Sequence, residues 1–158
     1  MSLLEVEGLK VQLRGADGPL SIVHGVDYRI EQGEVFGVAG ESGSGKTISM
    51  LALLGLLPEG SMVDGVVRFG GQDLLRLPRG KLREITGRDI GMVFQDPYTS
   101  LHPMLSVGQQ LTEHVRLHLG LDARAARQRA LELLSDVRIP DGKAALASYP
   151  HQFSGGML

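Results

Sequence analysis

Length, composition and charge restrict this chain of 158 residues to about one globular domain, with 42% hydrophobic and 22% charged residues. A formal net charge of -2, without a dense basic run, gives no reason to expect nucleic acid as a partner. The chain has no cysteine, which excludes disulfides and thiolate chemistry. The apolar stretch 48–57 is too short to span a bilayer, and no signal peptide is visible, so any membrane role must run through a partner.

The first part of the chain predicts strands on both sides of a turn. Residues 3–13 and 21–30 alternate apolar and polar side chains, and residues 14–19 read as the turn between them. We expect these strands to form an antiparallel sheet laid against a parallel core. Residues 34–39 are almost continuously apolar, which predicts the first buried strand of that core.

A glycine-rich loop follows. Residues 40–47, Gly-Glu-Ser-Gly-Ser-Gly-Lys-Thr, match the phosphate-binding pattern G-x-x-x-x-G-K-[ST], and residues 48–57 read as a helix. Backbone N–H groups and the helix dipole then converge on one anion. Lys46 is predicted to reach the β- and γ-phosphates and the Thr47 hydroxyl to ligate Mg²⁺. The alternative, a chance match in a Gly/Ser-rich turn, is disfavoured by the flanking strand and helix. The predicted nucleotide contacts are Gly40, Glu41, Ser42, Gly43, Ser44, Gly45, Lys46, Thr47 and Ile48.

The middle of the chain predicts a strand over 63–69, a short helix over 79–85 and a second core strand over 89–95. That last strand ends in the polar residue Gln95. Ligand-contacting groups lie beyond the carboxyl ends of strands in open parallel sheets, so Gln95 is a candidate to face the γ-phosphate. A polar strand end without function explains Gln95 equally well.

From residue 106 onward the apolar pattern has the period of a helix. It recurs every four positions, at Val107, Leu111, Val115 and Leu119, and stops at Gly120. Asp122 can cap a second helix over 123–137, and a shorter helix is expected over 143–147. The chain then reaches Ser154-Gly155-Gly156, where Ser154 could cap a further helix that binds an anion.

The order of these motifs resembles the nucleotide-binding subunit of ATP-binding cassette (ABC) transporters. Residues 40–47 match the family's Walker A loop, Gln95 its Q-loop and residues 153–157, Phe-Ser-Gly-Gly-Met, its signature, usually LSGGQ. Residues 94–103 and 149–158 look like those of the ATPase subunits of dipeptide, oligopeptide and nickel importers. The resemblance implies an α/β fold, with a phosphate-loop NTPase (RecA-like) core, an N-terminal antiparallel β subdomain and a helical subdomain.

The resemblance also implies a division of one partial domain into residues 1–33, 34–97 and 98–158, the antiparallel, nucleotide-binding and helical parts. It implies ATP and Mg²⁺ as cofactors. The implied partners are a second ATPase subunit and transmembrane permease subunits, on the cytoplasmic face of the cell membrane. Two such subunits bind ATP head to tail, so Ser154, Gly155 and Gly156 belong to the nucleotide of the partner. Lys46 and Gln95 are the implied catalytic residues, and Gln95 touches Mg²⁺ or the attacking water.

Two departures from the family pattern qualify this picture. Family members continue with a Walker B strand that ends in Asp-Glu, which is absent from these 158 residues. We therefore expect an N-terminal fragment that binds nucleotide at most and hydrolyses almost none. At the position where family members stack an aromatic ring on adenine, this chain offers only Leu13, while Tyr28 reads as a core strand residue. The alternatives are a non-catalytic nucleotide-binding or assembly module and another phosphate-loop enzyme, such as a small-molecule kinase.

Overall fold

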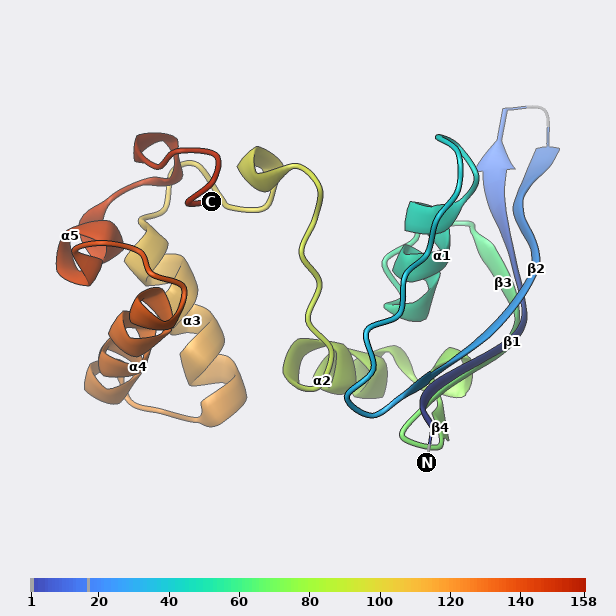
Figure 1. The fold of residues 1–158 in the computed structure, drawn as a ribbon, viewed down its shortest axis with the longest axis horizontal. Coiled ribbons are helices and arrows are strands. Elements are labelled where there is room, and N and C mark those ends of the chain that lie inside the picture. The colour runs from blue at the N-terminus through green and yellow to red at the C-terminus, as the bar shows by residue number, and fades with distance from the viewer. Residues whose placement is uncertain (1, 17) are drawn as a thin grey trace. The chain divides into compact units, whose positions relative to one another are not determined.

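A computed structural model describes residues 2–16 and 18–158. The chain divides into two compact units, residues 1–89 and residues 90–158. The first contains every strand of the described residues and the helices α1 and α2, and the second contains the helices α3, α4 and α5 (Figure 1). Each unit has its own buried side chains.

The first unit is built on an antiparallel sheet with the strand order β2-β1-β3-β4. β1 (Ser2–Gly15) and β2 (Gly18–Glu31) form a hairpin, and β3 (Met62–Phe69) pairs with the other edge of β1. The two-residue strand β4 (Gln72–Asp73) completes the sheet. The three strands predicted over 3–13, 21–30 and 63–69 are confirmed.

A bulge in β1 brings its buried side chains to one face. The pairing with β2 shifts between Val6 and Leu9, where Gly8 has a φ of 57°, in the left-handed region. The irregularity moves the buried positions from even to odd numbers, so Val6, Leu9 and Val11 are all buried. The Gly8 N–H donates to the Asp27 carboxylate of β2 at 2.7 Å.

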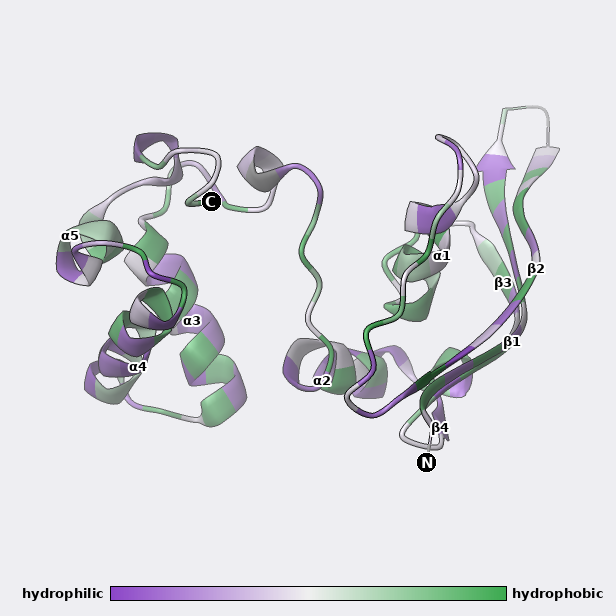
Figure 2. Cartoon of the chain, in the orientation of Figure 1, coloured by the Kyte–Doolittle hydropathy of each residue, from purple (hydrophilic) through white to green (hydrophobic). Residues whose placement is uncertain are grey.

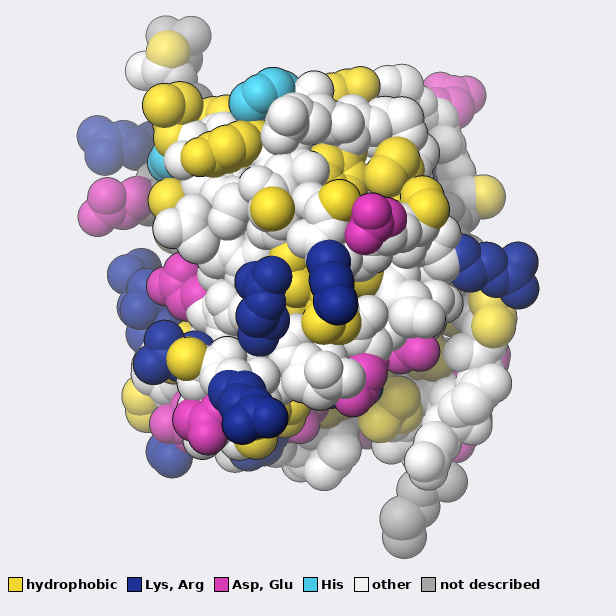
Figure 3. All heavy atoms as spheres, turned by 90° about the vertical axis from the view of Figure 1, so that its left-hand side faces the viewer, with side chains coloured by type: hydrophobic (Ala, Val, Ile, Leu, Met, Phe, Trp, Pro, Cys, Tyr) yellow, Lys and Arg dark blue, Asp and Glu magenta, His cyan; other side chains and the backbone are white. Residues whose placement is uncertain are grey.

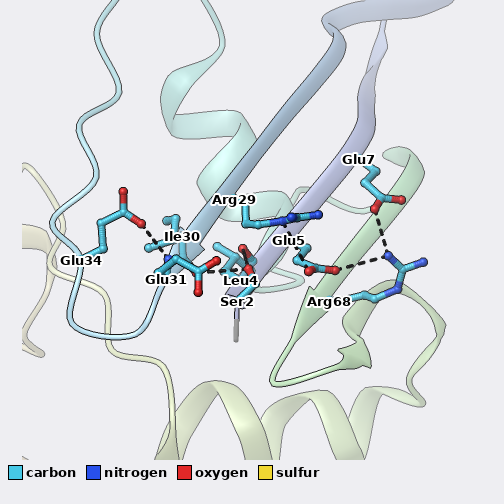
Figure 4. A network of polar contacts seen from close by, with 9 residues as sticks. All are labelled: Ser2, Leu4, Glu5, Glu7, Arg29, Ile30, Glu31, Glu34 and Arg68. Atoms are coloured by element: carbon cyan, nitrogen blue, oxygen red, sulfur yellow. Dashed lines mark hydrogen bonds and ion pairs between the residues drawn. The ribbon is translucent and has the colours of Figure 1, made fainter.

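The opposite face of the sheet carries ion pairs across three strands (Figure 4). Glu5 of β1 lies 3.5 Å from Arg29 of β2 and 3.6 Å from Arg68 of β3, and Arg68 also lies 3.1 Å from Glu7. Exposed pairs of this kind contribute at most about 1 kcal/mol each. Because Glu5 stands directly opposite both arginines, the pairs favour the observed register over a slipped one.

Helix α1 (Lys46–Leu53) lies against β1 and β2 and buries Ser49, Ala52 and Leu53. It begins two residues before the predicted helix over 48–57 and ends four residues before its predicted end. Gly55 adopts a φ of 66° and its N–H donates to Ala52 O at 3.2 Å, which closes the helix in a turn. The short helix predicted over 79–85 is confirmed as α2 (Arg79–Arg88), which follows the 3-10 turn η1 (Leu74–Arg76).

The two parallel core strands predicted over 34–39 and 89–95 are wrong for the described structure. Neither segment forms a strand, and Val35 and Val93 are 98% and 97% exposed. A strand requires a neighbour to pair its N–H and C=O groups, and neither segment has one among residues 2–16 and 18–158. Figure 2 shows hydrophobic colour along both irregular segments, so their apolar pattern is not matched by strand pairing.

The second unit packs three helices around one apolar cluster. They are α3 (Val107–Leu119), α4 (Ala123–Asp136) and α5 (Gly142–Ala147), and they confirm the helices predicted over 107–119, 123–137 and 143–147. The 3-10 turns η2 (Pro97–Thr99) and η3 (Pro150–Gln152) belong to the same unit. The buried cluster consists of Val107, Ala130, Leu134, Ala145, Leu146 and Phe153.

Local sequence signals define the ends of these helices. Ser106 and Gln109 form a reciprocal capping box at the start of α3, and Gly120 ends it with a φ of 64°. The Asp122 carboxylate accepts the Ala125 N–H at 2.8 Å, which confirms the predicted cap of α4. Asp141 caps α5 in the same way.

The face drawn in Figure 3 carries Lys and Arg beside Asp and Glu, with hydrophobic side chains between them. Mixed charge of this kind is typical of solvated helix surfaces. Within the part of the chain that the structure describes, no helix combines the length and the hydropathy needed to cross a bilayer. The same residues contain no group of three or more His, Cys, Asp or Glu side chains placed to hold a metal ion.

Candidate functional site

The glycine-rich loop leads directly into the N-terminus of α1. Gly43 and Gly45 adopt φ values of 82° and 87°, a region that glycine enters without steric cost. Gly45 is the N-cap residue, and no side chain caps the helix there. The first turn of α1 also lacks an acidic residue. The free N–H groups and the helix dipole therefore remain available to an anion.

Lys46 places its ammonium group inside the loop. Its Nζ atom donates to Gly40 O and Glu41 O, each at 2.7 Å, and to Ser44 Oγ at 3.3 Å. These bonds use all three donors of the ammonium group and draw the loop around one positive charge. An ammonium group beside uncapped helix N–H groups is the donor set that a phosphate oxygen requires.

Two glycines of the loop are needed for close approach. A Cβ atom on Gly40 would lie 2.8 Å from Ser44 Oγ. On Gly45 it would lie 3.1 Å from Ile22 O and 3.2 Å from Val23 Cγ2, both in β2. Gly45 thus lets the loop rest directly on β2, while the positive φ at this position adds strain to any larger residue.

The residues directly after Lys46 differ in exposure, from the exposed Thr47 to the buried Ser49. Thr47 is exposed, and among the residues that the structure describes no hydrogen-bond partner takes up its hydroxyl, which fits a group free to ligate a divalent cation. Ile48 is half-buried, and Ser49 is buried with its hydroxyl donating to Lys46 O at 2.7 Å. That bond ties the backbone of Lys46 to the first turn of α1.

A cavity of about 400 Å³ lies between β2, residues 36–40 and α1. Its lining is mainly apolar, and the Tyr28 and Phe36 rings stack in it with centroids 5.3 Å apart. The Tyr28 hydroxyl is buried without a hydrogen-bond partner in the described residues, and burial raises the pKa of Tyr28. Among the residues that line the cavity, only Lys46 carries a positive charge. Because most of the other lining side chains are apolar, we interpret the cavity as a gap in the apolar core beside the loop.

Gln95 belongs to the second unit and lies in an irregular, exposed segment rather than at a strand end. The next five residues form a compact turn. The Asp96 carboxylate accepts the Tyr98 N–H at 3.0 Å, and the Thr99 and Ser100 hydroxyls donate to Asp96 O at 3.2 and 3.0 Å. The orientation of the chain after Gln95 is therefore set by Asp96.

Residues 154–156 form an exposed turn beyond the helical cluster. The N–H groups of Met157 and Leu158 donate to Ser154 O at 2.9 and 3.1 Å. The bond from the Leu158 N–H to Ser154 O has the i, i+4 spacing of a first helical turn, and the helix that Ser154 was expected to cap stays a prediction. Phe153, directly before it, is buried in the cluster and anchors the turn.

The structure brings the predicted residues of the loop together around Lys46 and groups Gln95 with the Ser-Gly-Gly turn in the second unit. Sequence reasoning did not single out Tyr98, whose ring packs against Gly155. The only sequence signal was an aromatic residue shortly after Gln95. A contact between residues so far apart in the chain could not be read from it.

Comparison with known proteins matches residues 23–158 to the family described as "ABC transporter". The chain is 44% identical over 158 residues to "Dipeptide transport ATP-binding protein DppD" of Escherichia coli (strain K12), covering 99% of this chain and 48% of that protein. It is 40% identical over 155 residues to "Oligopeptide transport ATP-binding protein OppD" of Haemophilus influenzae, covering 98% of this chain and 48% of that protein. The chain thus spans about half the length of the curated relatives it matches.

A solved structure supports the same assignment at the level of the fold. The "Dimeric Structure of MJ0796, a Bacterial ABC Transporter Cassette" matches with a TM-score of 0.82 at 22% identity, covering 98% of this chain and 64% of that one. The predicted phosphate-loop NTPase fold, with its antiparallel β part and helical part, is confirmed by this match. Given the family match over most of its length, this chain belongs to the ABC transporter family.

Proposed function

We propose that this chain is the ATP-binding, energy-coupling part of a bacterial importer for peptides. The observation that carries the proposal is the loop geometry, in which the Lys46 ammonium group lies within a ring of loop acceptors beside the uncapped N-terminus of α1. The similarity to dipeptide and oligopeptide transport ATP-binding proteins supports the peptide cargo. Nickel, the second cargo class suggested by the sequence, is the alternative outcome of a transport test.

In this proposal residues 40–48 hold the phosphates of ATP. The backbone N–H groups of the loop and the start of α1 donate to the phosphate oxygens, and Lys46 exchanges its bonds to Gly40 O and Glu41 O for bonds to the ligand. Thr47 ligates Mg²⁺, which neutralises charge on the phosphates when it is bound. Gln95 orients a water molecule or Mg²⁺ at the far end of the phosphate chain.

A second ATPase subunit completes the site. Ser154, Gly155 and Gly156 of one chain close over the nucleotide held by Lys46 of the other, and both chains act on transmembrane permease subunits at the cytoplasmic face of the membrane. The exposed turn of residues 154–156 supports this role, because its backbone is free to approach an anion. The solved cassette MJ0796 is described as a dimer, which supports the arrangement.

The first experiment is titration calorimetry with ATP and Mg²⁺ on the chain and on its Lys46→Ala variant. Hydrogen bonds to charged groups contribute about 1.5–3 kcal/mol. The variant is therefore expected to bind ATP roughly ten- to a hundredfold more weakly. Lys143→Ala removes an exposed lysine from α5 and is the matched control, with unchanged binding expected. Equal affinity of Lys46→Ala and the unmodified chain would refute the phosphate-loop assignment.

The cargo is tested separately in cells. Deleting the gene is expected to abolish uptake of a labelled dipeptide and to leave nickel uptake unchanged. The opposite pattern would replace peptide by nickel as the cargo without affecting the nucleotide site. If uptake of both the dipeptide and nickel stays unchanged, the result contradicts the transport role.

A further inference from the structure

The side chain of Tyr98 lies beside Gly155 of the Ser154–Gly156 turn. A Cβ atom on Gly155 would lie 3.3 Å from the Tyr98 hydroxyl oxygen and 3.9 Å from its Cε2 and Cζ atoms. A methyl group at position 155 would therefore press on the Tyr98 phenol, with the hydroxyl oxygen as its nearest neighbour. A Cβ atom on Gly156 would meet nothing within 4 Å, so the neighbouring glycine is left open. The turn has one packed residue and one free residue.

Both sides of this contact are held in place. Tyr98 is oriented by the Asp96 turn, whose carboxylate accepts the Tyr98 N–H at 3.0 Å. The Ser-Gly-Gly turn is anchored by Phe153 in the helical cluster and by two N–H bonds to Ser154 O. Tyr98 is nevertheless 64% exposed, and within the described part of the chain its hydroxyl makes no hydrogen bond. The phenol therefore meets Gly155 by packing and not by a hydrogen bond.

Tyr98 also stands three residues after Gln95, in the bonded turn that begins at Asp96. In the proposed function Gln95 senses the nucleotide of its own chain, and residues 154–156 close over the nucleotide of the partner chain. The contact between Tyr98 and Gly155 links the chain segments that carry these two groups. A displacement of the Gln95 segment would move Tyr98 and, through it, the turn.

We propose that Tyr98 is a positioning residue that holds the Ser154–Gly156 turn in the orientation needed to close over the partner's nucleotide. The inference rests on the proposed function, because it assigns Tyr98 a role through that turn. The contact is one of packing, since no hydrogen bond of the described residues holds the hydroxyl, and the ring carries most of the side-chain surface that packs. In this proposal Tyr98 acts through the turn and not on the phosphates, so its removal is expected to lower turnover and to spare ATP binding by Lys46.

The test measures ATP hydrolysis by the full-length protein, assembled with its partner subunits. Tyr98→Ala is expected to lower kcat by roughly ten- to a hundredfold, the range seen when a small misplacement disturbs a catalytic geometry. Binding of ATP to isolated subunits is expected to stay unchanged. Tyr98→Phe keeps the ring and is expected to retain nearly full turnover. An unchanged kcat in Tyr98→Ala, or an equal loss in Tyr98→Phe, overturns the proposal.

A double-mutant cycle with Gly155→Ala tests the contact itself. Gly155→Ala alone presses a methyl group on the Tyr98 phenol, most closely on its hydroxyl oxygen, whereas Tyr98→Ala removes that neighbour. We expect Gly155→Ala to lower kcat several times less in Tyr98→Ala than in the unmodified protein. Strictly additive effects overturn the proposal, as does a fall in the unfolding temperature of Tyr98→Ala that accounts for its lost turnover.

Failure of this inference is distinguishable from failure of the proposed function. If Lys46→Ala keeps full ATP binding and turnover, the proposed function fails, whatever the Tyr98 variants do. If Lys46→Ala abolishes both while the Tyr98 variants and their cycle show no coupling, only the role of Tyr98 fails.

Discussion

Replacing Gly108 of α3 with alanine is expected to loosen the helical unit. A Cβ atom there would clash with the backbone oxygen of Leu146 in α5. A carbon atom and a carbonyl oxygen normally approach no closer than about 3.3 Å. The two helices must therefore move apart, and Leu146 belongs to the buried cluster that they share.

Three effects determine how much Gly108→Ala changes the free energy of unfolding. Overpacking a core costs about 1–3 kcal/mol. The Val107 N–H, next to Gly108, donates to Ser148 O at 2.9 Å, and losing that bond costs about 1 kcal/mol more. The higher helix propensity of alanine stabilises the helix by up to about 1 kcal/mol relative to glycine. The free energy of unfolding of the second unit is expected to fall by about 2 kcal/mol, which lowers the melting temperature of a unit this small by roughly 10 °C.

Amide hydrogen exchange, followed by mass spectrometry, measures this change locally. Peptides from α3 and α5 should exchange faster in Gly108→Ala, while those from β1 to β3 should not change. Gly80→Ala in α2 is the matched control, because a Cβ atom there meets nothing within 4 Å. It is expected to be neutral or stabilising by up to about 1 kcal/mol. Equal protection of α3 in both variants would show that α3 and α5 do not approach closely enough at Gly108 to exclude a Cβ atom.

Two further predictions concern Tyr28 and turnover. Burial raises the pKa of Tyr28 above its ordinary 10.0, so the folded state favours the neutral phenol, and the free energy of unfolding falls as the pH rises through and above that value. In Tyr28→Phe this fall, measured by denaturant titration between about pH 8 and 11, should be smaller, and an unchanged profile counts against the assignment. The 158-residue chain should release phosphate from ATP no faster than its Lys46→Ala variant, because no Asp-Glu pair of the Walker B type is in its sequence. Faster release would show that a general base is present that we have not identified.

The local elements were readable because each depends on residues close together in the chain. Alternation predicts β1, β2 and β3, and the four-residue period predicts α3 and α4. The caps at Ser106 and Asp122 and the stop at Gly120 need only a few neighbouring residues. The exact end of α1 was missed because its Gly55 turn competes with a continuing apolar pattern.

The two core strands were mispredicted for the opposite reason. The apolar runs at 34–39 and 89–95 record a preference for burial, but a strand exists only when another strand takes its hydrogen bonds. In the described residues none does, and Val35 and Val93 remain exposed. The division into residues 1–33, 34–97 and 98–158 stays a prediction, and the structure separates its two compact units after Asp89.

The sequence by itself determined the phosphate-loop pattern, because residues 40–47 specify both the glycines that allow close approach of the backbone and the lysine predicted to bind an anion there. It also determined the order of loop, glutamine and Ser-Gly-Gly by which the family is recognised. Only the tertiary structure decided that Gly45 rests on β2, that the Lys46 ammonium group lies within the loop and that Tyr98 packs on Gly155. Each of these contacts depends on how the chain path brings atoms together in space, which no local pattern of residue types encodes.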